Sequence, residues 1–172
     1  MARIAFEDQQ NWSHSVVTAK KQYELLPAEV RCNLNNIIDE IMILKSSLLD
    51  LTLAAGSSDA CRDCGGKCCN NGKFYVSLLD LMAYLRTSAE PPVPDFEISP
   101  LCPYGCSEGC LMKPGFRSVT CVIFNCEQVE SLLDESKLLR LRDFEIQLRE
   151  KVIQAEKLIG IRLGRPLLLS FQ

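Results

Sequence analysis

The hydrophobic positions of the chain predict a long helix in its N-terminal third. Between residues 30 and 51, apolar side chains recur at alternating steps of four and three, which is a heptad seam along one stripe of a helix. We expect this helix to begin near Pro27, because a proline loses no hydrogen bond in a first turn, and to end at Gly56. The seam consists of Val30, Leu34, Ile37, Ile41, Leu44, Leu48 and Leu51.

Three further helices are predicted along the chain. One begins at Ser13, whose hydroxyl can cap it, and a short one begins at Ser77 and stops before the four prolines of "AEPPVPDFEISP". From Glu127 to Leu158 the apolar residues keep a helical period, and Gly160 follows as a stop signal. Strand signals are weak, although "FYVSL" and "TCVIF" can form short extended pieces.

These patterns predict a mainly α protein, in which a helical bundle flanks an irregular, cysteine-rich, metal-binding centre. The expected parts are an N-terminal helical arm at 1–58, the cysteine-rich domain at 59–126 and a C-terminal helical arm at 127–172, together forming one compact domain. We expect the apolar stripes of the arms to pack on each other as a core. The seam at 30–51 is also long enough to form a homodimer or to bind a protein partner.

Charge and hydropathy narrow the classes of protein that fit. The formal net charge of the 172 residues is −3, with no basic stripe, so the chain lacks the electrostatic footprint of a nucleic-acid binder. The N-terminal segment lacks the apolar run of a secretory signal. Apolar stretches elsewhere are interrupted well short of the ~18 residues that cross a bilayer. We therefore expect a cytoplasmic protein with no membrane partner.

Cysteines are concentrated in the middle of the chain. Of the ten cysteines, nine lie between Cys61 and Cys126, and Cys32 lies outside. Because cytoplasmic thiols are kept reduced, clustered cysteines there favour metal ligation over disulfides. Thiolates are soft donors, which favour zinc, iron and iron–sulfur clusters.

The stretch "CRDCGGKCC" is the densest part of this group. The pair Cys61 and Cys64, separated by two residues, can close on one metal, and Gly65 and Gly66 allow positive φ and can direct N–H groups at sulfur. Adjacent side chains diverge, so the vicinal pair Cys68–Cys69 either serves two metals or divides between one ligand and one packed residue. Later cysteines must supply the remaining ligands. Four thiolates complete a zinc site or hold a cluster, so nine cysteines suffice for one or two sites.

Catalytic signals are weak. His14 is the only histidine and has no companion that would activate a cysteine, and we expect it to be an ordinary side chain. Asp63 and Glu108, which lie close to the cysteines in sequence, are expected to be solvated charges. The radical-enzyme spacing Cys-x3-Cys-x2-Cys fails because position 71 is Asn. The chain is therefore not expected to be an enzyme.

Four motifs occur in order: "CRDCGGKCC", "CPYG", "EGCLM" and "FRSVTCVIFNC". Together they resemble the YkgJ-like family, a zinc- or iron-chelating CxxCxxCC domain that includes flagellin lysine N-methylases. The chain departs from the family pattern by an extra residue before the vicinal pair, by Ser118 in place of proline, and by the additional Cys106. The resemblance covers residues 61–126 and makes Arg117 and Phe124 motif companions. It implies a ligand set of Cys61, Cys64, Cys68, Cys69, Cys102, Cys110, Cys121 and Cys126.

The function expected from these observations is metal binding through clustered thiolates. The cofactor is zinc or an iron–sulfur cluster in one or two sites, with a redox or electron-transfer role if it contains iron. Two alternatives stay open. The family resemblance implies a cluster-dependent, methylase-like enzyme, whereas the heptad seam suits an interaction module in which zinc is structural.

Overall fold

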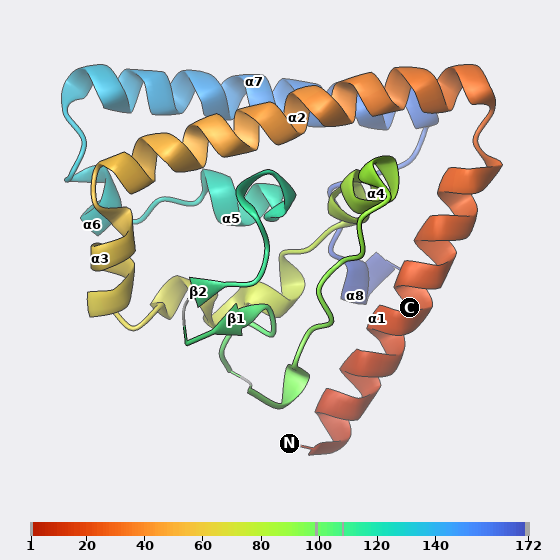
Figure 1. Ribbon diagram of the computed structural model, residues 1–172, viewed down its shortest axis with the longest axis horizontal. Helices are drawn as coiled ribbons and strands as arrows, with labels where there is room; N and C mark the ends of the chain where they lie inside the picture. Colours follow the sequence, from red (N-terminus) through yellow and green to blue (C-terminus); the bar gives the residue numbers. More distant parts are fainter. Residues whose placement is uncertain (1, 99, 108, 171–172) are drawn as a thin grey trace.

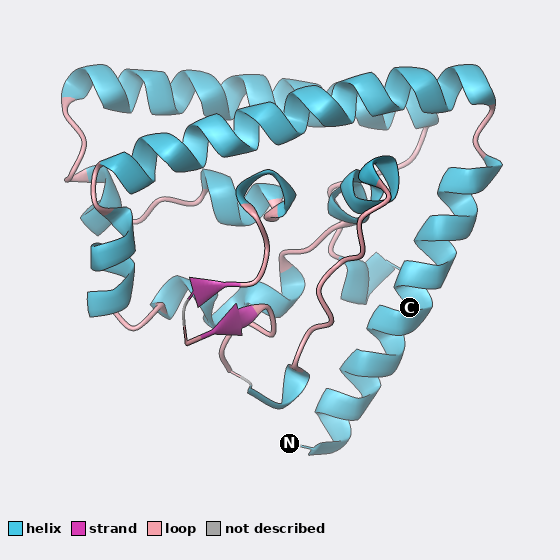
Figure 2. Ribbon diagram, viewed as in Figure 1, coloured by secondary structure: helices cyan, strands magenta, loops and turns pink. Residues whose placement is uncertain are grey.

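The computed structural model describes residues 2–98, 100–107 and 109–170, and this part of the chain is mainly helical, as predicted (Figure 1, Figure 2). Long helices form an outer frame, and short elements fill the space that it encloses. In chain order the elements are α1 (Ala2–Leu25), α2 (Ala28–Ala54), α3 (Ser57–Asp63), the 3-10 helix η1 (Lys67–Phe74), α4 (Leu78–Thr87), η2 (Phe96–Ile98), β1 (Gly105–Cys106), β2 (Gly109–Cys110), η3 (Pro114–Phe116), α5 (Val119–Ile123), α6 (Glu127–Glu130), α7 (Glu135–Ile159) and α8 (Leu167–Ser170).

The frame is built on α2 and α7, which run antiparallel along one edge of the molecule (Figure 1). Leu48 of α2 and Leu148 of α7 are fully buried, and Lys151 pairs with Glu40 across the two helices. Helix α1 turns away from the start of α2 and contacts α4 and α8. The two helical arms of the sequence therefore pack directly on each other.

The heptad seam lies on the buried side of α2. Leu34, Ile37, Ile41 and Leu48 belong to the protein's own core, while the other seam residues are half-buried. The apolar stripe thus packs within the chain, and a homodimer through the same stripe stays a prediction. None of the helices in the described ranges is both long enough and apolar enough to cross a bilayer.

A lysine lies within the buried stripe of α2. Lys45 is fully buried, and its Nζ donates to Asp80 Oδ1 of α4 at 2.6 Å. The other carboxylate oxygen of Asp80 accepts hydrogen bonds from the N–H and the hydroxyl of Ser77, at 2.9 and 2.7 Å. Ser77 caps α4 as predicted, and the capping carboxylate also fixes α4 to α2.

Three sequence expectations need correction. The first helix begins well before Ser13, which lies inside α1 and donates its hydroxyl hydrogen to Gln9 O at 2.9 Å; a serine can bond the preceding turn in this way instead of capping. "TCVIF" is not extended, because most of it forms α5. The helix expected from Glu127 to Leu158 is divided into α6 and α7, with Asp134 capping α7. Gly160 ends α7 in the left-handed conformation, as predicted.

Candidate metal centre

The nine clustered cysteines lie on the short elements inside the frame. Cys61 is in α3 and Cys64 ends it, Cys68 and Cys69 are in η1, and Cys102 precedes the hairpin. Cys106 and Cys110 are in the hairpin strands, Cys121 is in α5, and Cys126 is the N-cap of α6. Each of the ten cysteines is a free thiol, and Cys32 is exposed on α2. The predicted ligands are therefore supplied by α3, η1, the hairpin with the residue before it, α5 and α6.

The turn after α3 has the glycine conformations that the sequence predicts. Gly65 and Gly66 have φ of +66° and +67°, in the left-handed region. The N–H of Gly66 donates to the carbonyl of Cys61 at 3.1 Å rather than to sulfur, and the thiol of Cys64 donates to the same carbonyl at 3.3 Å. The glycines thus shape the loop between Cys64 and Cys68, while the expected N–H contacts to sulfur from Gly66 are replaced by a backbone bond.

Contacts with η1 bring the second cysteine group against the first. A Cβ atom added at Gly72 would lie 2.4 Å from Cys102 Sγ, so this position admits no side chain without a shift of Cys102. The hydroxyl of Tyr75 donates to the carbonyl of Cys68 at 3.3 Å. Neither Gly72 nor Tyr75 stood out in the sequence, because each acts through a residue remote in the chain or through backbone atoms.

Ser118 has a structural role that the proline of the family pattern could not perform. Its buried hydroxyl donates to the carbonyl of Tyr75 at 2.6 Å and accepts from the N–H of Thr120 at 3.2 Å. It thereby caps α5 and joins the start of that helix to the end of η1. The helix that carries Cys121 is positioned by this bond.

A two-stranded hairpin holds Cys106 and Cys110. Gly105 pairs with Cys110, and Cys106 pairs with Gly109. Directly opposed residues share one face of a sheet and successive residues alternate, so Cys106 and Cys110 lie on opposite faces. The N–H of Gly105 donates to the carbonyl of Cys102 at 2.9 Å, which brings Cys102 to the base of the hairpin. The register therefore separates Cys106, the residue that is additional to the family pattern, from Cys110.

Helices α3 and α6 are in contact on the far side of the centre from the start of α1 (Figure 1). Loss of water raises the pKa of the Cys61 thiol, and the neighbouring Cys64 and Cys126 raise it further. The pKa of Cys68 is also raised, first by loss of water and then by Cys126 and Cys64. Negative charge on the sulfur of Cys61 or Cys68 is thus opposed by Cys64 and Cys126.

The pKa values of Cys69, Cys102 and Cys121 are raised in the same way. Burial raises the pKa of Cys102 to about 11, with Cys110 adding to the effect and a backbone hydrogen bond from Tyr104 opposing it. Loss of water raises the pKa of Cys69, as does Cys110, whereas the positive charge of Arg117 lowers it. Crowding around the sulfur of Cys121 removes water and raises its pKa, although part of the residue is exposed, and Cys102 adds to that rise.

Within the described ranges, no three Cys, His, Asp or Glu side chains converge closely enough to hold a metal ion as they stand. The donor chemistry nevertheless suits a soft metal, because cysteine sulfur is a soft donor that coordinates as the thiolate. Formation of a site requires these side chains to converge further.

The other residues singled out in the sequence lie as follows. Arg117 donates from Nε to the carbonyl of Met112 at 3.3 Å, and Phe124 is exposed. Asp63 is exposed, and Glu108 lies outside the described residues. His14 is exposed on α1, with its Nε2 3.5 Å from Thr18 Oγ1.

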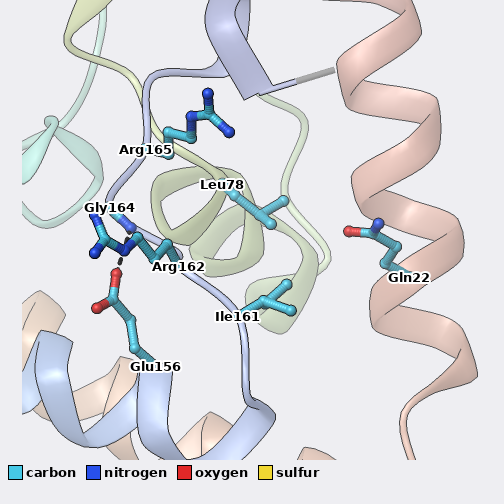
Figure 3. A pocket seen from close by; sticks show the side chains of 7 residues that line it. All are labelled: Gln22, Leu78, Glu156, Ile161, Arg162, Gly164 and Arg165. Atoms are coloured by element: carbon cyan, nitrogen blue, oxygen red, sulfur yellow. Dashed lines mark hydrogen bonds between the residues drawn. The ribbon is translucent and has the colours of Figure 1, made fainter. Parts of the chain in front are cut away.

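A pocket of about 960 Å³ lies apart from the predicted ligands, none of which lines it. It is bordered by α1, the start of α4, the last turn of α7 and the segment that follows (Figure 3). Glu156 accepts there from the N–H groups of Leu163 and Gly164, at 2.8 and 3.0 Å. The lining residues are Gln22, Leu78, Glu156, Ile161, Arg162, Gly164 and Arg165.

The relation to the YkgJ-like family rests on the four cysteine motifs and stays a prediction. No protein-family model, curated protein or solved structure matches the chain.

Proposed function

We propose that the protein binds zinc or an iron–sulfur cluster through cysteine thiolates. One observation carries the proposal: thiols from separate elements lie close enough that neighbouring thiols raise the pKa values of Cys61, Cys68, Cys69, Cys102 and Cys121. We place the protein in the cytoplasm, where such thiols stay reduced. The proposed ligands are Cys61, Cys64, Cys68, Cys69, Cys102, Cys110, Cys121 and Cys126.

Electrostatics explains why this set of thiols suits a metal. Loss of water and neighbouring thiols both disfavour a lone thiolate, as the raised pKa values of Cys61 and Cys68 indicate. A bound cation supplies the missing positive charge, so the thiols lose their protons and coordinate as thiolates. Arg117 supplies part of this compensation beside Cys69. Crowded thiols of this kind are therefore better suited to ligation than to acting as free nucleophiles.

The consequence of binding depends on the metal. Zinc would stabilise the irregular centre, because the free energy of metal binding contributes directly to folding. An iron–sulfur cluster would add one-electron chemistry and with it a redox or electron-transfer role. In both cases the chain's contribution is to hold the thiolates in place through the turn at Gly65–Gly66, the hairpin and the cap at Ser118.

Elemental analysis and visible absorption of protein purified without oxygen test the proposal. Stoichiometric zinc in a colourless protein, or iron and sulfide with broad visible absorption, is the expected result. Cys64→Ser should lower the metal content, whereas Cys32→Ser, which changes an exposed thiol on α2, should leave it unchanged. Wild-type protein that retains neither metal and does not take up added zinc would overturn the proposal.

A further inference from the structure

We infer that the ligands form two separate four-thiolate sites, site A with Cys61, Cys64, Cys68 and Cys126, and site B with Cys69, Cys102, Cys110 and Cys121. This assignment rests on the proposed metal binding. It adds which thiols act together, which spacing along the chain does not determine. The two sites interleave in sequence, because site A takes the first cysteine of the vicinal pair and the last cysteine of the segment.

The division begins inside η1. A 3-10 helix has about three residues per turn, so adjacent side chains point roughly 120° apart. Cys68 and Cys69 both lie within η1 and therefore face different directions. Gly72 follows Cys69 by one turn of three residues, so the two positions share the face of η1 that packs against Cys102. One ion cannot readily take both members of this pair, and each must find its partners elsewhere.

Site A is assembled where α3 meets α6. Cys61 lies in α3 and Cys64 is its C-cap, and the carbonyl of Cys61 accepts hydrogen bonds from the thiol of Cys64 and the N–H of Gly66. Cys126 is the N-cap of α6, which contacts α3. Cys68 follows after the two glycines of the turn. Site A thus takes three cysteines from one short segment and a fourth from the far end of the cysteine-rich part of the chain.

Site B is assembled around the hairpin and α5. Cys102 packs against Gly72 of η1, and its carbonyl accepts from Gly105, the partner of Cys110 in the hairpin. Cys121 lies in α5, whose start is joined to the end of η1 through Ser118 and Tyr75. The opposite face of the hairpin carries Cys106, which leaves this thiol out of the set.

The two sites are adjacent, because a Cβ atom at Gly66, in the turn that follows Cys64, would lie 4.0 Å from the sulfur of Cys69. Each four-thiolate set has the number and type of ligands of a structural zinc site.

Zinc titration followed by native mass spectrometry tests the division with the full chain. We expect two zinc ions on the wild type and on the Cys106→Ser control. The two decisive variants share the change at Cys61 and differ in which member of the vicinal pair, Cys68 or Cys69, is also replaced. Cys61→Ser/Cys68→Ser removes two ligands of site A and should keep one zinc, whereas Cys61→Ser/Cys69→Ser damages both sites and should keep none.

Equal zinc content in these two double variants would overturn the division, as would a single ion on the wild type. Either result would leave metal binding itself intact, whereas no zinc on the wild type would instead defeat the proposed function. Should a variant fail to fold, wild-type protein with less than saturating zinc can be treated with an alkylating reagent, and the modified cysteines identified by peptide mapping. As the amount of zinc is varied, the protection of Cys68 from alkylation should change together with that of Cys126, and the protection of Cys69 together with that of Cys110. Joint protection of Cys68 and Cys69 with all the others would refute two sites.

Discussion

The α2–α7 pair buries leucine and isoleucine side chains along its length, with Leu34, Leu48 and Leu148 fully enclosed. The described segment from residue 58 to 75, which carries four of the cysteines, has one buried residue, Gly72. Apolar burial contributes about 25 cal/mol per Å², so the helical pair has a driving force of its own and this segment has little. The comparison teaches that the two regions depend on different interactions, and that metal binding would matter for the second.

The largest effect should come from the buried ion pair of the helical region. Lys45→Met leaves the Asp80 carboxylate without its cation, and breaking a buried pair costs about 3–5 kcal/mol. Arg149→Ala, which removes an exposed pair with Glu145 on α7, is the control and should cost below about 1 kcal/mol. Urea unfolding measures both. An equal loss of unfolding free energy in the two variants would show that the buried pair contributes no more to stability than the exposed pair.

Truncation of a core leucine should have the next largest effect. Leu48→Ala should lower the free energy of unfolding by about 2–5 kcal/mol, because a fully buried side chain leaves a cavity. The matched control is Ile43→Ala on the same helix, where the side chain is 65% exposed and a change within about 0.5 kcal/mol is expected.

Repeating the Leu48→Ala measurement with a chelator tests whether the stability of the helical pair depends on metal in the cysteine centre. The loss should be the same with and without metal, because the core cluster that buries Leu48, formed with Val122, Leu133 and Leu141, contains no cysteine. A loss that disappears on metal removal would mean that the helical pair and the cysteine centre are one cooperative unit.

A smaller effect, confined to the cysteine centre, is expected for Gly72→Ala. The added Cβ would lie 2.4 Å from Cys102 Sγ, and overpacking of this kind costs about 1–3 kcal/mol. Displacement of Cys102 should also lower zinc affinity, which competition with a chromophoric chelator measures. At Gly164 the nearest atom would be 3.6 Å away, so Gly164→Ala should change neither quantity. If Gly72→Ala leaves both stability and zinc affinity unchanged, Cys102 is not a ligand of the metal.

The smallest effect concerns the first turn of α7. Hydrogen bonds from the backbone N–H and the side chain of Lys137 lower the pKa of Asp134 below its ordinary value of 3.8. The stabilisation is therefore present above that value and is lost as the pH falls through the lowered pKa. Asp134→Asn keeps a capping oxygen without the charge, so its melting temperature should depend less on pH in this range than that of the wild type. Melting temperatures that fall equally steeply with decreasing pH in the two proteins would contradict this role of Asp134.

Local sequence signals predicted much of the helical region and the beginning of the cysteine centre. The heptad seam of α2, the cap at Ser77 and the stop at Gly160 depend on residues a few positions apart, and the structure confirms each. The positive φ of Gly65 and Gly66 was predicted for the same reason. Lys45 also left a signal, since it follows Ile41 by four residues on the buried stripe, but its partner Asp80 left none.

The sequence by itself determined that this is a mainly helical protein with its thiols gathered between two helical arms, because periodicity, capping and cysteine clustering are properties of neighbouring residues. Tertiary structure decided which thiols are neighbours: α3 meets α6, Gly72 meets Cys102, and the hairpin separates Cys106 from Cys110. These contacts join residues far apart in the chain or depend on strand register. Their geometry follows from how α2 and α7 pack and how the short elements fit between them, which no local pattern encodes.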